Sequence, residues 1–165
     1  ALPQKLWKVG VFVNASYDEM AGIAETAGLT HLQLHGDESP ELCLRLQQNG
    51  FAVIKALRLK RPEDLQTLAK FSEPVLLDAA VPGHWGGSGQ LADWELAARA
   101  AGLRRCLLAG GLSPDNLQAA WTQVRPWGLD LSSGVESAPG IKDAAKLKDL
   151  FKKARQAENA DFDRP

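Results

Sequence analysis

The chain has little surplus charge of either sign, and this shortage excludes a class of partner. Its 165 residues carry 19 Lys and Arg against 20 Asp and Glu, a net charge of −1 at pH 7. Neutralising the phosphate backbone of a nucleic acid takes a basic excess, so no nucleic-acid partner is expected. Long apolar runs are missing too. None approaches the ~20 residues that span a bilayer, so no membrane partner is expected either.

Signals for export and for covalent cross-links are also scarce. No signal peptide is visible at the start of the sequence, which favours a cytoplasmic location. The two cysteines, Cys43 and Cys106, lack the spacing of a metal site or a redox motif. Because free cysteine is among the most buried residue types, we expect both to be reduced residues of the core.

What the sequence does contain is a regular alternation of apolar, strand-like runs with helix-like stretches. Six strands are predicted at residues 8–13, 31–34, 52–57, 74–78, 105–109 and 128–131. Six helices are predicted at residues 18–27, 40–49, 62–70, 93–101, 114–124 and 143–157. Repeated βα units predict an α/β fold with parallel strands and helical crossovers. We expect one domain over residues 1–157 and a polar tail over residues 158–165.

Two successive predicted strands each open into a small, Gly- and Ser-rich turn. Such turns expose backbone N–H groups, and a following helix adds the positive end of its dipole. In an eight-stranded α/β barrel, the loops after the last two strands are a frequent phosphate site. The predicted phosphate-binding residues are Gly110, Gly111, Ser132, Ser133 and Gly134.

Polar residues near the carboxyl end of one strand point to a ligand pocket. Gln33 and His35 lie two residues apart and therefore share one side of the strand, while Leu32 and Leu34 take the other. We expect the leucines to face the helices, which turns Gln33 and His35 toward the axis or mouth of a barrel as substrate contacts. The alternative is a buried Gln–His pair that the backbone satisfies.

Carboxylates at strand ends are the candidates for acid–base chemistry. Asp78 closes an apolar strand, where burial can raise the pKa of a carboxyl group and make it a general acid. A helix cap or a loop hydrogen bond is the alternative. Asp130 either contacts substrate or orients nearby backbone N–H groups, and Glu136 is expected just inside a short helix. The Gly-rich segment 83–89 predicts either a pliable loop or a backbone that closely approaches a ligand.

Taken together, these residues resemble phosphoribosylanthranilate isomerase, a tryptophan-biosynthesis family with the (β/α)8 TIM-barrel fold. The ordered set at these spacings is highly specific. The matching motifs are Val9-Gly10-Val11-Phe12-Val13-Asn14, Gln33-Leu34-His35-Gly36-Asp37-Glu38, Leu76-Leu77-Asp78, Gly86-Gly87-Ser88-Gly89, Asp93-Trp94, Leu108-Ala109-Gly110-Gly111-Leu112 and Asp130-Leu131-Ser132-Ser133-Gly134-Val135-Glu136.

The resemblance implies an Amadori rearrangement of N-(5′-phosphoribosyl)anthranilate to 1-(2-carboxyphenylamino)-1-deoxyribulose 5-phosphate. It implies that Asp78 is the general acid that protonates the furanose ring oxygen, and that the Gly and Ser turns hold the phosphate. The pocket would be lined by Gln33, His35 and Asp130. No metal or cofactor is expected, because the nitrogen of the substrate itself supplies the electron push.

The sequence also departs from the family pattern. A Lys-Ile-Cys-Gly motif on the family's first strand, whose Cys is the general base, and a carboxylate-binding Arg after the second strand have no counterpart here. The match begins at the family's third strand, so we expect about six of eight βα units and no activity from this chain alone.

Two alternatives remain open at this stage. One is a non-catalytic fragment that associates through its open sheet edges. The other is a different phosphate-binding barrel such as indole-glycerol-phosphate synthase, for which Lys55 is the only candidate strand Lys.

Overall fold

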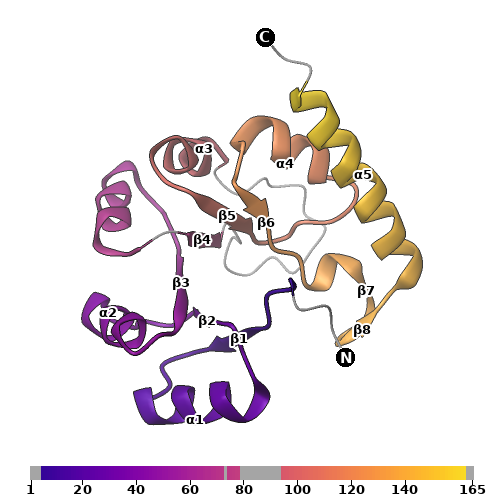
Figure 1. The fold of residues 1–165 in the computed structure, drawn as a ribbon. Helices are drawn as coiled ribbons and strands as arrows, with labels where there is room; N and C mark the ends of the chain where they lie inside the picture. The colour runs from indigo at the N-terminus through magenta and orange to yellow at the C-terminus, as the bar shows by residue number, and fades with distance from the viewer. Residues whose placement is uncertain (1–4, 73, 79–93, 163–165) are drawn as a thin grey trace.

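The fold is a curved, parallel sheet with helices on its outer side. A computed structural model describes residues 5–72, 74–78 and 94–162. The strands pair in chain order, each parallel to the next, as the βα pattern predicted. They are β1 (Val9–Phe12), β2 (His31–Leu34), β3 (Ala52–Leu57), β4 (Val75–Asp78), β5 (Cys106–Ala109) and β6 (Gly128–Leu129). In Figure 1 the strands follow one another along a curved path.

The predicted helices are present in the described residues and lie outside this path (Figure 1). They are α1 (Tyr17–Ala27), α2 (Pro40–Gln48), η1 (Pro62–Lys70), α3 (Trp94–Leu103), α4 (Leu117–Val124) and α5 (Ala144–Phe162). The segment η1 is a 3-10 helix rather than an α-helix. Helix α5 extends beyond residue 157 into the segment that was predicted as a polar tail.

Local sequence signals explain where the first two helices begin and end. The Ser16 hydroxyl accepts a hydrogen bond from the Glu19 N–H at 3.3 Å, and Ser39 caps α2 in the same way with Pro40 behind it. Gly28 ends α1 at φ 60°, a left-handed conformation in which a side chain would be strained.

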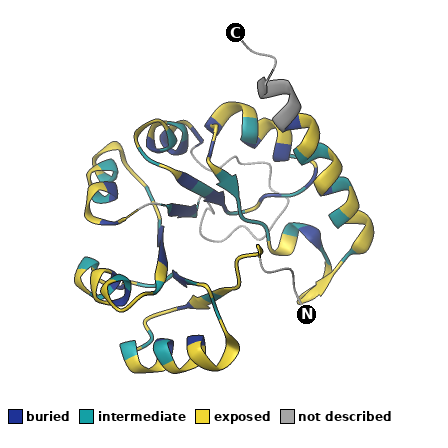
Figure 2. Ribbon diagram, viewed as in Figure 1, coloured by how far each residue is buried: buried dark blue, intermediate teal, exposed yellow. Residues whose placement is uncertain are grey.

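The main core lies between the outer face of the sheet and the helices. Leu32 and Leu34 are fully buried in it against Met20 of α1 and against α2, which confirms the predicted facing of β2. Both cysteines are free and buried in this layer, as expected, and burial raises the pKa of the Cys43 thiol. In Figure 2 the strands β2 to β5 are largely dark and buried, while β1 is mostly exposed and β6 is intermediate, and the helices expose their outer surfaces.

A smaller cluster covers the inner face of the sheet. It consists of Ile54, Ala56, Leu76 and Ala109, with Leu107 packed against it. Because side chains alternate between faces along a strand, the residues two positions beyond Ala56 and Leu76 share this inner face at the carboxyl rim. Those residues are Arg58 and Asp78.

The chain after β6 differs from the prediction. It forms the short 3-10 helix η2 (Ser133–Val135) and an antiparallel hairpin of β7 (Glu136–Ala138) and β8 (Ile141–Lys142). Glu136 therefore opens a strand, and its predicted place inside a short helix is wrong. Its carboxylate accepts hydrogen bonds from Lys142 Nζ at 2.7 Å and from the Gly140 N–H at 3.2 Å, and these bonds hold the hairpin together.

The two outermost strands of the sheet approach each other at their amino-terminal ends. Trp7 precedes β1 and Trp127 precedes β6, and their ring centroids lie 5.7 Å apart. Trp7 also stacks on His31 at 4.0 Å. The carboxyl-terminal part of β1 is open instead, where Val11 and Val13 are 61% and 65% exposed.

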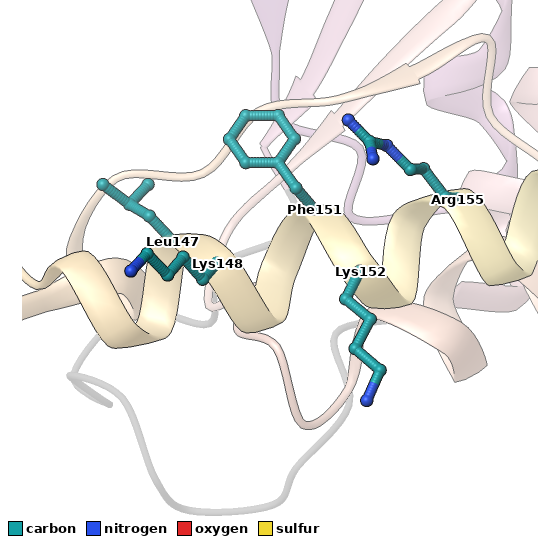
Figure 3. Close-up of a pocket in the computed structure, with 5 residues that line it drawn as sticks. All are labelled: Leu147, Lys148, Phe151, Lys152 and Arg155. Atoms are coloured by element: carbon teal, nitrogen blue, oxygen red, sulfur yellow. The ribbon is translucent and has the colours of Figure 1, made fainter.

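Helix α5 has one covered face and one open face. Leu150 and Ala157 are buried against Leu117 of α4 and Val135 of η2. The open face carries a shallow pocket with an exposed Phe151 at its centre (Figure 3), lined by Leu147, Lys148, Phe151, Lys152 and Arg155. None of the described helices is long and apolar enough to cross a membrane.

Candidate active site

A line of polar side chains runs along the inner face at the carboxyl rim of the sheet. Gln33 Nε2 donates a hydrogen bond to Asp130 Oδ2 at 3.4 Å, and Gln33 Oε1 lies 3.3 Å from His35 Nδ1. His35 Nε2 lies in turn 3.3 Å from Asp78 Oδ2. The structure thus joins four of the predicted site residues, which come from β2, β4 and the end of β6.

These contacts fix where protons can reside. A carboxylate cannot donate, so the Asp130 contact requires the Gln33 amide to turn its NH2 toward Asp130 and its oxygen toward His35. An amide oxygen only accepts, so His35 Nδ1 must carry the hydrogen of that contact. The contact between His35 Nε2 and Asp78 then needs one proton, which either the imidazole or the carboxyl group supplies.

Asp78 has a second polar neighbour that sequence reasoning missed. Arg58 Nε lies 3.2 Å from Asp78 Oδ2, while most of the Arg58 side chain is exposed. The Asp78 side chain itself is only 11% exposed. A guanidinium at this distance favours the carboxylate form and opposes the effect of burial on which the prediction rested.

Directly behind the rim lies a buried ion pair that was not predicted either. Lys55 Nζ lies 2.9 Å from Glu38 Oε2 and also donates to the carbonyls of Leu34 at 3.1 Å and Gly36 at 2.6 Å. Glu38 accepts further hydrogen bonds from the N–H groups of Asn14 at 2.8 Å and of Gly36. Burial alone would raise the pKa of Glu38, but the hydrogen bonds from Lys55 and Asn14 outweigh it and hold that pKa below its ordinary value.

Lys55 is therefore not placed to act on a substrate. It alternates with Ile54 and so lies on the outer face of β3, below α2, where its ammonium group is saturated by three acceptors. A catalytic strand Lys was the one feature that favoured an indole-glycerol-phosphate synthase reading. The position of Lys55 removes that support.

The two turns predicted to bind phosphate lie side by side. They follow β5 and β6, which are neighbours in the sheet. Gly110 and Gly111 have φ values of 93° and 64°, where a side chain would be strained. Gly134 packs against the backbone carbonyl of Leu112 so closely that a Cβ atom would collide with it. The close approach of these two turns depends on glycine.

An open groove of about 730 Å³ reaches His35 and Arg58, two residues that contact Asp78. It is lined by the turns after β1 and β2, by the end of β3 with the residues that follow it, and by Thr67 of η1 and Phe71. The Gly-rich segment 83–89 lies outside the described residues. The structure therefore brings the predicted residues Gln33, His35, Asp78 and Asp130 together and adds Arg58 to them.

A carboxylate–imidazole contact on a parallel sheet, next to two glycine turns, is an arrangement typical of α/β enzymes that act on small phosphorylated substrates. Comparison with known proteins makes this specific. A family model described as N-(5′-phosphoribosyl)anthranilate (PRA) isomerase matches residues 2–153. The chain belongs to this family.

Individual relatives agree with the family match. The N-(5′-phosphoribosyl)anthranilate isomerase of Gloeothece citriformis is 47% identical over 155 residues, which cover 91% of this chain and 70% of the relative. The N-(5′-phosphoribosyl)anthranilate isomerase of Acetivibrio thermocellus is 43% identical over 167 residues. The match covers 96% of this chain and 76% of that relative.

Solved structures show the same similarity in three dimensions. A crystal structure of phosphoribosyl anthranilate isomerase from Thermotoga maritima superposes with a TM-score of 0.84 at 38% identity, covering 94% of this chain and 76% of that one. A crystal structure of the isomerase in complex with reduced 1-(o-carboxyphenylamino)-1-deoxyribulose 5-phosphate gives 0.79 at 35% identity, covering 94% and 74%.

Proposed function

We propose that this chain carries the acid and phosphate-binding parts of a phosphoribosylanthranilate isomerase of tryptophan biosynthesis. The reaction is the Amadori rearrangement of N-(5′-phosphoribosyl)anthranilate. The observation that carries the assignment of roles is the contact between His35 Nε2 and Asp78 Oδ2 at the carboxyl end of β4, on a nearly buried carboxyl group. A family relationship alone would not say which residue moves the proton.

Asp78 acts as the acid in this proposal. The proton it delivers is the one shared with His35 Nε2, which stays available although Arg58 favours the carboxylate form. Asp78 gives this proton to the ring oxygen of the ribose while the anilino nitrogen pushes electrons onto C1, so the C1–O bond breaks and an iminium forms. The proton on C2 is then removed, and the resulting enamine gives the aminoketose product. Because His35 Nδ1 is tied to Gln33, Nε2 is held where it shares the Asp78 proton. Gln33 and Asp130 orient the acid through His35.

The phosphate of the substrate would bind at the paired turns after β5 and β6. The positive φ angles of Gly110 and Gly111 and the close packing of Gly134 on Leu112 leave the turns without projecting side chains. Backbone N–H groups of Gly110, Gly111, Ser132, Ser133 and Gly134 can then approach phosphate oxygens directly. No metal or cofactor is proposed for this chemistry, because the anilino nitrogen of the substrate supplies the electron push and the protein has only to move protons.

The remaining groups of the reaction are proposed to lie elsewhere in the complete enzyme. The proton acceptor for C2 and the Arg for the anthranilate carboxylate, which the family resemblance implies, are not among the motifs of these 165 residues. The chain spans 70% and 76% of two relatives, which leaves room for further βα units that complete an eight-stranded barrel. We also propose a cytoplasmic location, in line with the biosynthetic family to which the chain belongs.

A fluorescence assay of N-(5′-phosphoribosyl)anthranilate consumption tests this function. We expect no turnover from the 165-residue chain and isomerisation once the further units are supplied, covalently or in trans. Turnover by a purified monomer of exactly these residues would refute the incomplete site. If the completed protein also failed to turn over, the alternative of a non-catalytic, self-associating fragment would stand instead.

A further inference from the structure

We propose that Lys55 and Glu38 form a positioning pair that holds His35 in line with Asp78 from the opposite face of the sheet. The pair touches no substrate in this proposal. It acts through the backbone of the turn after β2. The proposal rests on the proposed function only for the roles of His35 and Asp78 in the reaction.

Lys55 fixes the peptide groups on both sides of His35. Its Nζ donates to the carbonyl of Leu34, the residue before His35, and to the carbonyl of Gly36, the residue after it. The N–H of His35 donates to the carbonyl of Phe12 at 2.8 Å. The backbone of His35 is thus held at three points, and one ammonium group supplies two of them.

Glu38 completes this arrangement. Its carboxylate balances the Lys55 charge at 2.9 Å and accepts from the N–H of Gly36 at 2.9 Å and from that of Asn14 at 2.8 Å. The Lys55 and Glu38 side chains are only 5% and 1% exposed. A buried charge without its partner is costly, so the pair and the turn it binds form or fail as a unit.

Stability alone does not account for this pair. Replacing a buried ion pair by apolar residues is often neutral for stability, so a sheet that needed only a filled core would not require it. An apolar pair cannot donate directed hydrogen bonds to the carbonyls that flank His35. The His35 imidazole has contacts of 3.3 Å on both sides, near the limit of a useful hydrogen bond, so a small shift of its backbone breaks one of them.

Nuclear magnetic resonance of the 165-residue chain tests this coupling without any turnover. The chain has three histidines, so the ring signals of His35 can be assigned and followed. Asp78→Asn removes the acidic partner of Nε2 and should shift those signals in the parent. In a Lys55→Met/Glu38→Leu background, which keeps the core filled, we expect that response to be lost. A response of the same size in both backgrounds overturns the proposal.

Two further variants guard this test. Val53→Ala, at a buried position on the same face of β3 as Lys55, weakens packing but keeps both charged side chains of the pair, and should leave the His35 response intact. If the double variant does not fold, Glu38→Gln takes its place. It keeps the shape and removes the counter-charge, so a reduced response is expected and an undiminished one refutes the pair.

The isomerase assay supplies a second readout in the completed enzyme. A misplaced catalytic group costs up to about 100-fold in rate, so we expect the Lys55→Met/Glu38→Leu variant to lose roughly 10- to 100-fold in kcat with little change in KM. Val53→Ala should keep its kcat per folded molecule. An unchanged kcat in the double variant contradicts the proposal. Absence of turnover in the parent would instead refute the proposed function, and the resonance test would still decide the role of the pair.

Discussion

The carboxyl rim of the sheet presents different chemical groups on its two sides. Over β2, β3 and β4 the rim presents charged side chains, with Asp78 between an imidazole and a guanidinium. Over β5 and β6 it presents, beside Asp130, glycine turns that pack backbone on backbone. Proton transfer needs a titratable group at a set distance, whereas a phosphate can be held by N–H groups alone. The difference implies that the two sides fail in different ways when they are mutated.

The largest effect on catalysis is expected from mutations over β2, β3 and β4, where the rim presents charged side chains. Asp78→Asn should keep the fold and the affinity for substrate and reduce kcat of the completed isomerase by ~10² or more, the usual scale for losing a positioned proton donor. Steady-state kinetics measures it. Asp149→Asn, at an exposed position of α5, is the matched control and should leave kcat unchanged. A near-normal kcat in folded Asp78→Asn would remove Asp78 from the mechanism.

Mutations in the glycine turns over β5 and β6 should change KM rather than kcat. In Gly134→Ala the new Cβ meets the Leu112 carbonyl and pushes the two turns apart. Loss of one charge-assisted hydrogen bond, about 1.5 kcal/mol, raises KM and the dissociation constant for inorganic phosphate roughly tenfold. Gly102→Ala, in α3 with open space around it, should affect neither. A fall in kcat with unchanged phosphate affinity would contradict the proposed difference between the two sides of the rim.

A smaller effect, on self-association, is expected away from the rim, at the open strand β1. We expect the 165-residue chain to self-associate in sedimentation experiments, because a strand edge with exposed apolar residues invites pairing. Val11→Lys places a charge on this edge and should weaken association roughly threefold. Ile23→Lys, on the exposed surface of α1, serves as the control. Equal behaviour of the two variants would rule out the edge as the contact.

The smallest effect is a dependence of stability on acid. The folded pKa of Glu38 is lowered, so its contribution is present above the unfolded pKa and is lost as the pH falls through the folded pKa. Urea midpoints between pH 6 and pH 3 should therefore fall in the parent and fall less steeply in Glu38→Gln. The pKa of Glu136 is also lowered, by hydrogen bonds from Lys142 and Gly140, but this pair is at the surface and solvent screens it. Glu136→Gln should thus change the fall of the urea midpoint between pH 6 and pH 3 less than Glu38→Gln does.

The strands were predictable because each is a short apolar run with a clear end. The observed bounds of β2 and β3 are those predicted, and the others differ by at most two residues at an end. The hairpin of β7 and β8 was missed because its exposed strands of three and two residues carry no apolar alternation. Residues 62–70 form a 3-10 helix although their pattern is helical, since apolar spacing does not distinguish the two helix types.

At the site, sequence reasoning found the residues that end strands and missed their partners. Gln33, His35, Asp78 and Asp130 were predicted and do meet. Their roles in binding and catalysis stay predictions. The contacts of Arg58 with Asp78 and of Lys55 with Glu38 join residues that are 20 and 17 positions apart, and no local pattern encodes such distances. One signal was available: a Lys inside an otherwise apolar strand requires a buried anion nearby.

The contact of Trp7 with Trp127 offers a spectroscopic signal for whether the two ends of the curved sheet stay together. Two indoles 5.7 Å apart are close enough for their electronic transitions to couple, so we expect a circular dichroism couplet that is lost when the starts of β1 and β6 separate. His31, stacked on Trp7 at 4.0 Å, can quench its fluorescence when protonated. The opening and closing of the sheet can thus be timed by spectroscopy on the unlabelled chain, with a reporter on the side of the sheet away from the active site.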